Sequence, residues 1–133
     1  MIIDSCVLID IFTKDEKWFD WSYSKLTELY KNNTKLLINP IIFAEVGINF
    51  DSLNDLQKTV SIMKLTNQSL SEAALFNAGR AFYQYKRKHK GSKNNVLPDF
   101  FIGAQADDIS CEIITRDVKK FRSYFPKVKL IHP

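Results

Sequence analysis

The sequence is poor in the residues that build zinc sites and disulfide frameworks. Its 133 residues include only two cysteines, Cys6 and Cys111, and two histidines. The cysteines form no CxxC pair and no histidine stands at zinc-ligand spacing near them, which argues against a structural zinc site. Two isolated thiols are typical of buried, reduced cysteines. Neither His89 nor His132 is placed as a general base.

Long apolar runs are also missing. No stretch approaches the roughly 18 residues of a membrane span. The apolar opening MIIDSCVLIDIF carries Asp4 and Asp10 and lacks the basic start of a signal peptide. We therefore expect a cytoplasmic protein without a membrane partner. The chain shows no repeat, low-complexity segment or internal linker, which predicts one domain over residues 1–133.

What the sequence does contain is material for one core and a slight excess of positive charge. Hydrophobic residues make up 45% of the chain, enough for it to fold unaided. Lysine and arginine number 19 against 15 acidic residues, which gives a net charge of +4. This balance favours an acidic partner such as nucleic acid, but many basic proteins bind none.

Short apolar segments alternate with amphipathic ones. Strands are expected at residues 1–4, 35–39, 62–65, 112–115 and 128–131. Helices are expected at residues 18–30, 40–49 and 54–61, from a Ser69 cap with Glu72 as its capping-box partner, from Pro98, and between the last two strands. Residues 6–12 suit a helix or a longer first strand equally. The alternation predicts an α/β protein whose parallel sheet is covered by helices on both faces.

Four acids stand at the ends of expected strands or in early helical turns. Asp4 follows the first strand, Asp117 lies two residues past the fourth, and Glu45 and Asp99 lie on helices. In parallel α/β sheets, ligands bind beyond the carboxyl ends of the strands. Four carboxylates in one place would repel one another, and Mg²⁺ or Mn²⁺ with oxygen ligands suits such a site. One or two such ions could activate water for phosphodiester hydrolysis.

Each acid also has a simpler interpretation. Asp4 and Asp117 could be helix N-caps, and Glu45 could face water. Asp99 could stabilise its helix by interacting favourably with the helix dipole in the first turn. A surface or helix-end position is expected for three further acids, Asp10, Asp107 and Asp108.

Hydroxyl and basic side chains flank the acids. Ser5 and Thr115 could orient a carboxylate or a metal-bound water, or could simply bond nearby backbone. A run of basic residues could be a solvated helix end or a strip that contacts RNA phosphates without reading sequence. Its members are Lys86, Arg87, Lys88, Lys90 and Lys93, and Arg116, Lys119, Lys120 and Arg122 could add to it.

Four blocks, MIIDSCVLIDIF, INPIIFAEV, LPDFFIGAQA and IITRDVKKF, resemble the signature blocks of PIN-domain ribonucleases. The short form is similar to the VapC-type toxins of toxin–antitoxin pairs. The resemblance implies a three-layer α/β/α sandwich and a metal-dependent endoribonuclease. It implies that Asp4, Glu45, Asp99 and Asp117 are the catalytic metal ligands, supported by Ser5 and Thr115. It also implies a homodimer, neutralised by a cognate antitoxin that inserts a segment into the active site.

Gln105 departs from this family pattern, because many relatives have histidine after IGA. The change could alter substrate choice or the dimer surface. Cys6 stands where relatives often have a small or β-branched residue, and we expect no function for it.

Other functions compete with the toxin. A PIN-type nuclease could serve housekeeping RNA processing, or the fold could bind RNA or protein without catalysis. An aspartate-nucleophile phosphatase also begins with a strand ending in aspartate, but it needs a second acid two residues later, where this chain has Cys6.

Overall fold

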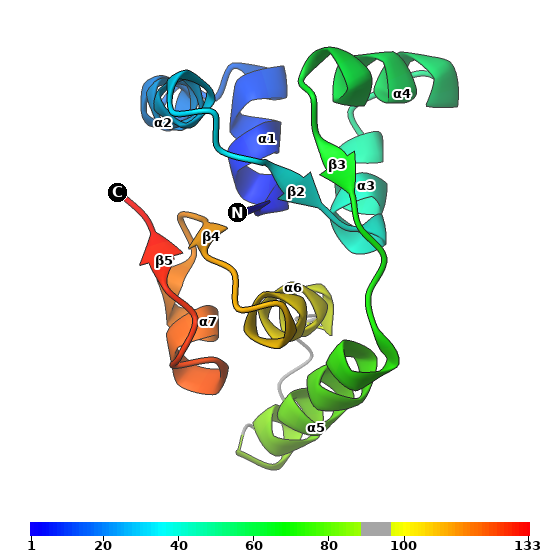
Figure 1. The fold of residues 1–133 in the computed structure, drawn as a ribbon, viewed down its shortest axis with the longest axis vertical. Coiled ribbons are helices and arrows are strands. Elements are labelled where there is room, and N and C mark those ends of the chain that lie inside the picture. Colours follow the sequence, from blue (N-terminus) through cyan, green and yellow to red (C-terminus); the bar gives the residue numbers. More distant parts are fainter. Residues whose placement is uncertain (89–96) are drawn as a thin grey trace.

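The structure is a computed structural model that describes residues 1–88 and 97–133. Figure 1 shows short strands in the middle of the molecule with helices around them. In chain order the elements are β1 (Ile2–Ile3), α1 (Ser5–Thr13), α2 (Phe19–Lys31), β2 (Leu37–Ile38), α3 (Pro40–Gly47), α4 (Leu53–Ile62), β3 (Thr66–Asn67), α5 (Glu72–Lys88), α6 (Leu97–Asp108), β4 (Ile113–Ile114), α7 (Val118–Tyr124) and β5 (Leu130–Ile131).

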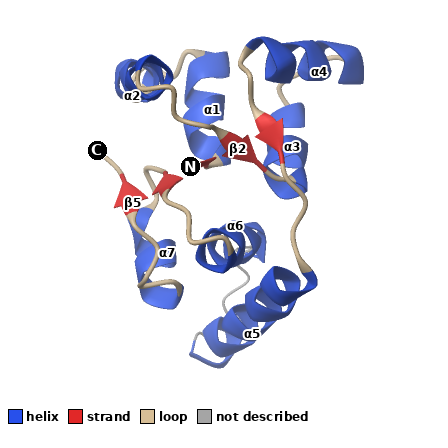
Figure 2. Ribbon diagram, in the orientation of Figure 1, coloured by secondary structure: helices blue, strands red, loops and turns tan. Residues whose placement is uncertain are grey.

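The five strands form one parallel sheet in the order β3-β2-β1-β4-β5. Successive residues of a strand face opposite sides of a sheet. Both residues of β1, β2 and β4 are buried, so the sheet is covered on both faces. Figure 2 shows the helices around the sheet. The predicted α/β architecture with a central parallel sheet of five strands is confirmed.

Strand order changes direction next to β1. The chain runs outward from β1 to β2 and β3, and then returns to place β4 on the other side of β1. This is the switch point at which α/β sheets bind ligands. Asp4 directly follows β1, and Thr115 directly follows β4.

Most predicted elements are present, and residues 6–12 belong to a helix, α1. The third strand was placed too early. The apolar residues Ile62 and Met63 end α4, Lys64 turns the chain with φ 50°, and β3 follows at Thr66–Asn67. Because β3 is an exposed edge strand, it carries no apolar signal.

Two helix details also differ from the sequence prediction. The buried residues of α2 are Ser22, Leu26 and Leu29. Tyr23, which the helical spacing of Phe19, Tyr23, Leu26 and Tyr30 predicts on the apolar face, is 56% exposed. The start of α5 is capped by Ser71 and not by Ser69, because the Ser71 hydroxyl accepts a hydrogen bond from the Ala74 N–H at 3.0 Å. None of the helices in the described ranges combines the length and apolar character of a membrane span.

Candidate metal centre

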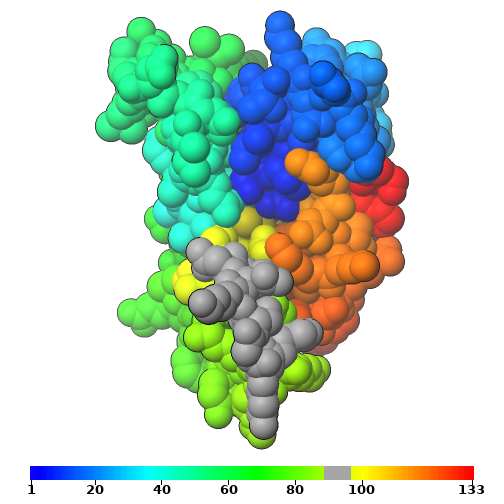
Figure 3. Space-filling model, turned by 180° about the vertical axis from the view of Figure 1, so that it is seen from behind, coloured from blue at the N-terminus to red at the C-terminus, as the bar shows by residue number. Residues whose placement is uncertain are grey.

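Four segments that are far apart in sequence bring the acids toward one edge of the sheet. Asp4 follows β1 and Asp117 lies three residues past the end of β4, while Glu45 is on α3 and Asp99 is in the first turn of α6. In Figure 3, the blue N-terminal segment, the cyan segment around α3, yellow α6 and the orange segment after β4 meet on one face of the molecule.

Asp4 is held by neutral hydrogen-bond donors. Its side chain is 4% exposed. Oδ2 accepts hydrogen bonds from the Thr115 hydroxyl at 2.6 Å and the Cys6 thiol at 3.3 Å. Oδ1 has only a long contact with the Ser5 hydroxyl, at 3.4 Å. Asp4 occupies the N-cap position of α1, but its side chain makes no cap hydrogen bond, so the capping interpretation fails for the carboxylate.

The surroundings of Asp4 disfavour its charge. Burial raises the pKa of Asp4 to about 6, against the lowering effect of the Thr115 and Cys6 hydrogen bonds, and repulsion from Asp99 and Glu45 raises it further. Burial, followed by the charge of Asp4, raises the pKa of the Cys6 thiol to about 12, which keeps it protonated as a donor.

One interpretation of the sequence placed Glu45 in open solvent, and the structure does not agree. The residue is only partly exposed. Its Oε2 atom is fully buried and has no hydrogen-bond partner among the described residues. A buried carboxylate oxygen without a donor is costly, so this atom is suited to a cation.

Asp99 and Asp117 share Lys120, one of the residues that could add to the basic strip. Lys120 Nζ lies 2.7 Å from Asp99 Oδ2 and 3.2 Å from Asp117 Oδ2. Burial raises the pKa of Asp99, the Lys120 ammonium opposes this rise, and the charge of Asp117 adds to it. The spacing of Asp117 and Lys120, three residues apart on an expected helix, was the signal that could have revealed this pair.

Asp117 is likewise not a side-chain cap. It stands at the N-cap of α7, but its carboxylate makes no cap hydrogen bond. Its backbone N–H donates instead to the Thr115 hydroxyl, at 3.0 Å. The buried Thr115 hydroxyl also donates to Asp4, so it links the segment that carries Asp117 to the Asp4 carboxylate.

The carboxylates suit a divalent cation in chemistry and charge, but they are not drawn together around one point. Among residues 1–88 and 97–133, no three histidine, cysteine, aspartate or glutamate side chains form a group that could hold a metal ion as they stand. Lys120 supplies positive charge to Asp99 and Asp117 in this arrangement. Carboxylate oxygens of this kind are the ligands that hard cations prefer.

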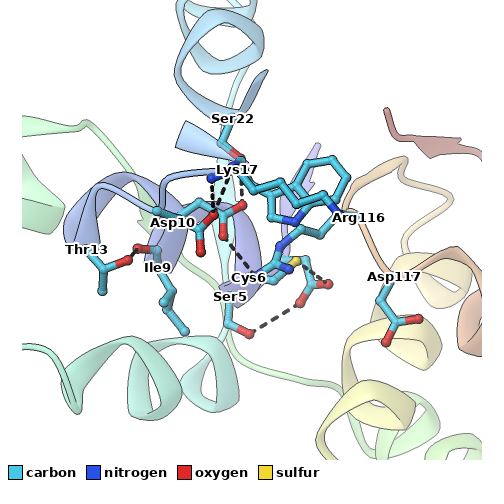
Figure 4. A network of polar contacts seen from close by, with 12 residues as sticks. Ser5, Cys6, Ile9, Asp10, Thr13, Lys17, Ser22, Arg116 and Asp117 are labelled. Carbon is cyan, nitrogen blue, oxygen red and sulfur yellow. Dashed lines mark hydrogen bonds and ion pairs between the residues drawn. The ribbon is translucent and has the colours of Figure 1, made fainter. Parts of the chain in front are cut away.

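Asp10 was expected at a helix end or on the surface, and this is wrong. Its side chain is 1% exposed. Figure 4 shows Asp10 of α1, Ser22 of α2 and Arg116 turned toward one another. The Ser22 hydroxyl donates to Asp10 Oδ2 at 2.8 Å, and Arg116 Nη2 lies 2.9 Å from Asp10 Oδ1. Nothing in the sequence signalled this pair, because its members are more than 100 residues apart.

The basic strip is only partly within the described residues. Lys86, Arg87 and Lys88 are exposed in the last turn of α5, as a solvated helix end predicts. Their cationic groups lie 4.8–5.9 Å from aromatic rings of Phe82, Tyr83 and Tyr124. Lys90 and Lys93 fall outside the described residues.

Gln105 lies in the interior, where it is 2% exposed, and therefore not on a dimer surface. Its Oε1 accepts a hydrogen bond from Asn39 Nδ2 at 2.9 Å, and its Nε2 donates to the Gln68 carbonyl at 3.1 Å. Asn39 in turn caps α3, because its Oδ1 accepts from the Ile42 N–H. Gln105 thus supports the start of the helix that carries Glu45. Cys6 and Cys111 are both free, but each is only partly buried.

No protein-family model and no curated protein sequence matches the chain. Solved structures do match it. A chain of the VapBC2 complex from Rickettsia felis, bound to promoter DNA, has a TM-score of 0.71 at 19% identity and covers 99% of this chain and 97% of its own. A chain of VapBC-1 from nontypeable Haemophilus influenzae has a TM-score of 0.69 at 15% identity, covering 98% and 96%.

A chain of FitAcB from Neisseria gonorrhoeae gives a similar result, with a TM-score of 0.69, 16% identity and coverage of 99% and 96%. These likenesses extend over nearly the whole of each chain. The resemblance to VapC-type proteins is therefore confirmed at the level of the fold: the chain has the PIN-like α/β fold found in VapBC and FitAB complexes.

Proposed function

We propose that the chain is a metal-dependent endoribonuclease whose Asp4, Glu45, Asp99 and Asp117 hold Mg²⁺ or Mn²⁺. The observation that carries the proposal is the electrostatic state of Asp4. It is buried, bonded only to neutral donors and close to two further carboxylates. A protein that needed these residues only for stability would gain by replacing them, because unpaired buried charge is costly. A divalent cation would compensate that charge.

The residues around Asp4 would hold the acid in one orientation. Thr115 and Cys6 both donate to Oδ2, which leaves Oδ1 with only the long Ser5 contact and therefore available to a cation. Glu45 offers its unpartnered Oε2 from α3. A divalent cation bound by these oxygens would activate water and stabilise charge on the leaving oxygen of a phosphodiester.

Lys120 would have a second role in this proposal. Its ammonium holds Asp99 and Asp117 in place when no cation does so. When a cation binds the two aspartates, the released lysine would lie beside the site with its positive charge free. Such a charge suits the RNA backbone.

The chain would act as the toxin of a toxin–antitoxin pair of the VapC type. The supporting observation is the full-length likeness to chains of VapBC and FitAB complexes. In this proposal the protein is a cytoplasmic homodimer, RNA is its substrate and a cognate antitoxin neutralises it. Housekeeping RNA processing and RNA or protein binding without catalysis remain the alternative functions. Growth arrest on expression, relieved by the product of an adjacent gene, would separate the toxin from a housekeeping nuclease.

A matched pair of variants on α6 tests the nuclease directly. Asp99→Asn removes one proposed ligand, whereas Asp107→Asn removes an exposed carboxylate two turns later on the same helix. Purified protein is incubated with single-stranded RNA in Mg²⁺, in Mn²⁺ and in EDTA. We expect cleavage by the wild type and Asp107→Asn only with a divalent ion, and none by folded Asp99→Asn. Full cleavage by Asp99→Asn, or wild-type cleavage in EDTA, would contradict the proposal.

A further inference from the structure

A second buried aspartate lies on α1 and is not used by the metal site. Asp10 is 1% exposed, accepts a hydrogen bond from the Ser22 hydroxyl and forms an ion pair with Arg116. A buried carboxylate with a charged partner rarely adds stability relative to an apolar side chain of similar size. The pair therefore calls for another explanation, and the position of Arg116 offers one.

Arg116 connects the pair to the acid site. It stands between Thr115, which donates to Asp4, and Asp117. Its backbone N–H also contacts the Cys6 thiol, the second donor to Asp4. In Figure 4, Ser5 and Cys6 of the acid site lie directly beside the Asp10 and Arg116 cluster. The positive charge of Arg116 therefore lies at the border of the site where a phosphodiester would be cut.

The guanidinium of Arg116 is fixed but not fully enclosed. Its side chain is 32% exposed. Its Nη2 lies 2.9 Å from Asp10 Oδ1, and the carbon of the guanidinium lies 5.7 Å from the centre of the Trp18 ring. The Nε atom is buried and has no hydrogen-bond partner among the described residues. Lys17 approaches the same ring at 4.7 Å. A planar guanidinium with part of its donors free can bind two oxygens of a phosphate, and holding it in place beforehand reduces the entropy lost on binding.

We propose that Asp10 and Trp18 orient Arg116 as a receptor for a backbone phosphate of single-stranded RNA beside the acid site. Asp10 is then a positioning residue, and Arg116 is the group that touches the substrate. The inference rests on the proposed ribonuclease function and deepens it. A purely structural staple between α1 and the segment after β4 is the competing explanation.

The experiment measures binding of fluorescein-labelled oligouridine RNA in EDTA over a range of salt concentrations, so that cleavage is not needed. Arg116→Gln should weaken binding, and the slope of log affinity against log salt should fall by about 0.7, the value for one phosphate contact in a single strand. A structural staple predicts a lower melting temperature with an unchanged slope. That unchanged slope would overturn the proposal.

Asp10→Asn gives the sharper test, because charge alone predicts the opposite result. Removing an acid from a protein of net charge +4 should tighten RNA binding. The exposed Asp20, two residues from Trp18, is the matched control, and Asp20→Asn should leave affinity unchanged or raise it slightly. We expect Asp10→Asn to weaken binding about threefold because Arg116 is no longer held. In Arg116→Gln protein the same change should have no further effect.

Tighter binding by Asp10→Asn, like that of the control, would overturn the proposal. If Asp10→Asn does not fold, Arg116→Lys decides the matter. It keeps the charge and loses the planar fork, so the slope should stay and the affinity should fall, whereas wild-type affinity would refute the receptor. Wild-type protein that binds RNA through Arg116 but never cleaves it would refute the nuclease and leave this inference standing.

Discussion

Asp4, just before the first helix, and Asp10, in its last turn, are buried in opposite electrostatic surroundings. Asp4 and Asp10 are 4% and 1% exposed, and both accept a hydrogen bond from a buried hydroxyl, that of Thr115 or Ser22. They differ in the charge of their neighbours. Asp10 faces the Arg116 guanidinium, whereas Asp4 faces neutral donors and the carboxylates of Asp99 and Glu45.

This difference teaches that burial alone does not mark a ligand. A buried carboxylate beside a cation is compensated in charge, while one among acids and neutral donors takes up a proton more readily or, in the function proposed above, binds a divalent cation. Burial accordingly raises the pKa of Asp4 to about 6. Both arrangements depend on the same segment, because Thr115 and Arg116 are adjacent after β4.

The largest expected effect is on RNA cleavage, which should differ strongly between variants of Asp4 and of Asp10. Asp4→Asn keeps the shape of the side chain but removes the charge that would hold a divalent ion. Cleavage of single-stranded RNA in Mg²⁺ should fall more than about 100-fold, beyond the usual loss of an outer-shell partner. Asp10→Asn should cost only the few-fold loss that follows from weaker RNA binding. Equal losses in kcat for the two variants would abolish the distinction between the residues.

Stability should change in opposite directions for the same two variants. Because burial raises the pKa of Asp4 from 3.8 to about 6, folding is favoured by its protonated form, and this contribution is lost as pH rises through 6. At pH 8 without metal, Asp4→Asn should raise the free energy of unfolding by about 1–3 kcal/mol. Asp10→Asn should lower it by about 1–3 kcal/mol, a value discounted because Arg116 is partly exposed.

Urea unfolding in EDTA at pH 8 and pH 4 measures both effects. The gain from Asp4→Asn should shrink toward zero at pH 4, where Asp4 is protonated in the wild type. A destabilised Asp4→Asn protein at pH 8 would mean that its hydrogen bonds outweigh the cost of its buried charge.

Removing the donor to Asp4 should reduce cleavage less than removing the charge of Asp4 itself. Thr115→Val has nearly the same volume but leaves Asp4 Oδ2 with only the Cys6 thiol and the Asp117 N–H without its acceptor. Cleavage should fall about 10-fold to 100-fold, as for other residues that orient metal ligands. Thr115→Ser keeps the hydroxyl and should retain most of the activity. Wild-type rates for Thr115→Val would show that Asp4 needs no orienting donor.

The sequence predicted what depends on local patterns. Apolar segments located four of the five strands, and acids after strand ends indicated the candidate site. It misplaced β3 because an exposed edge strand lacks an apolar signal, and it chose Ser69 over Ser71 because either serine could begin a helix. The pairs of Asp10 with Arg116 and of Asn39 with Gln105 were out of reach, because each joins residues brought together only by the sheet order.

The charge state of the site was equally hidden. Four acids in a basic chain suggested repulsion, but the sequence could not tell which acid would be deprived of counter-charge. The structure gives Lys120 to Asp99 and Asp117, gives Arg116 to Asp10, and leaves Asp4 with neutral donors.

Calorimetric titration with Mn²⁺ tests the account most directly, using the wild type, Asp4→Asn and the control Asp107→Asn. Because the ion must displace a proton from Asp4 below its pKa of about 6, affinity should weaken about fivefold from pH 6 to pH 5. At pH 7.5 the wild type and Asp107→Asn should bind alike and Asp4→Asn should not bind. Equal binding by Asp4→Asn, or none by the wild type, would contradict the central claim.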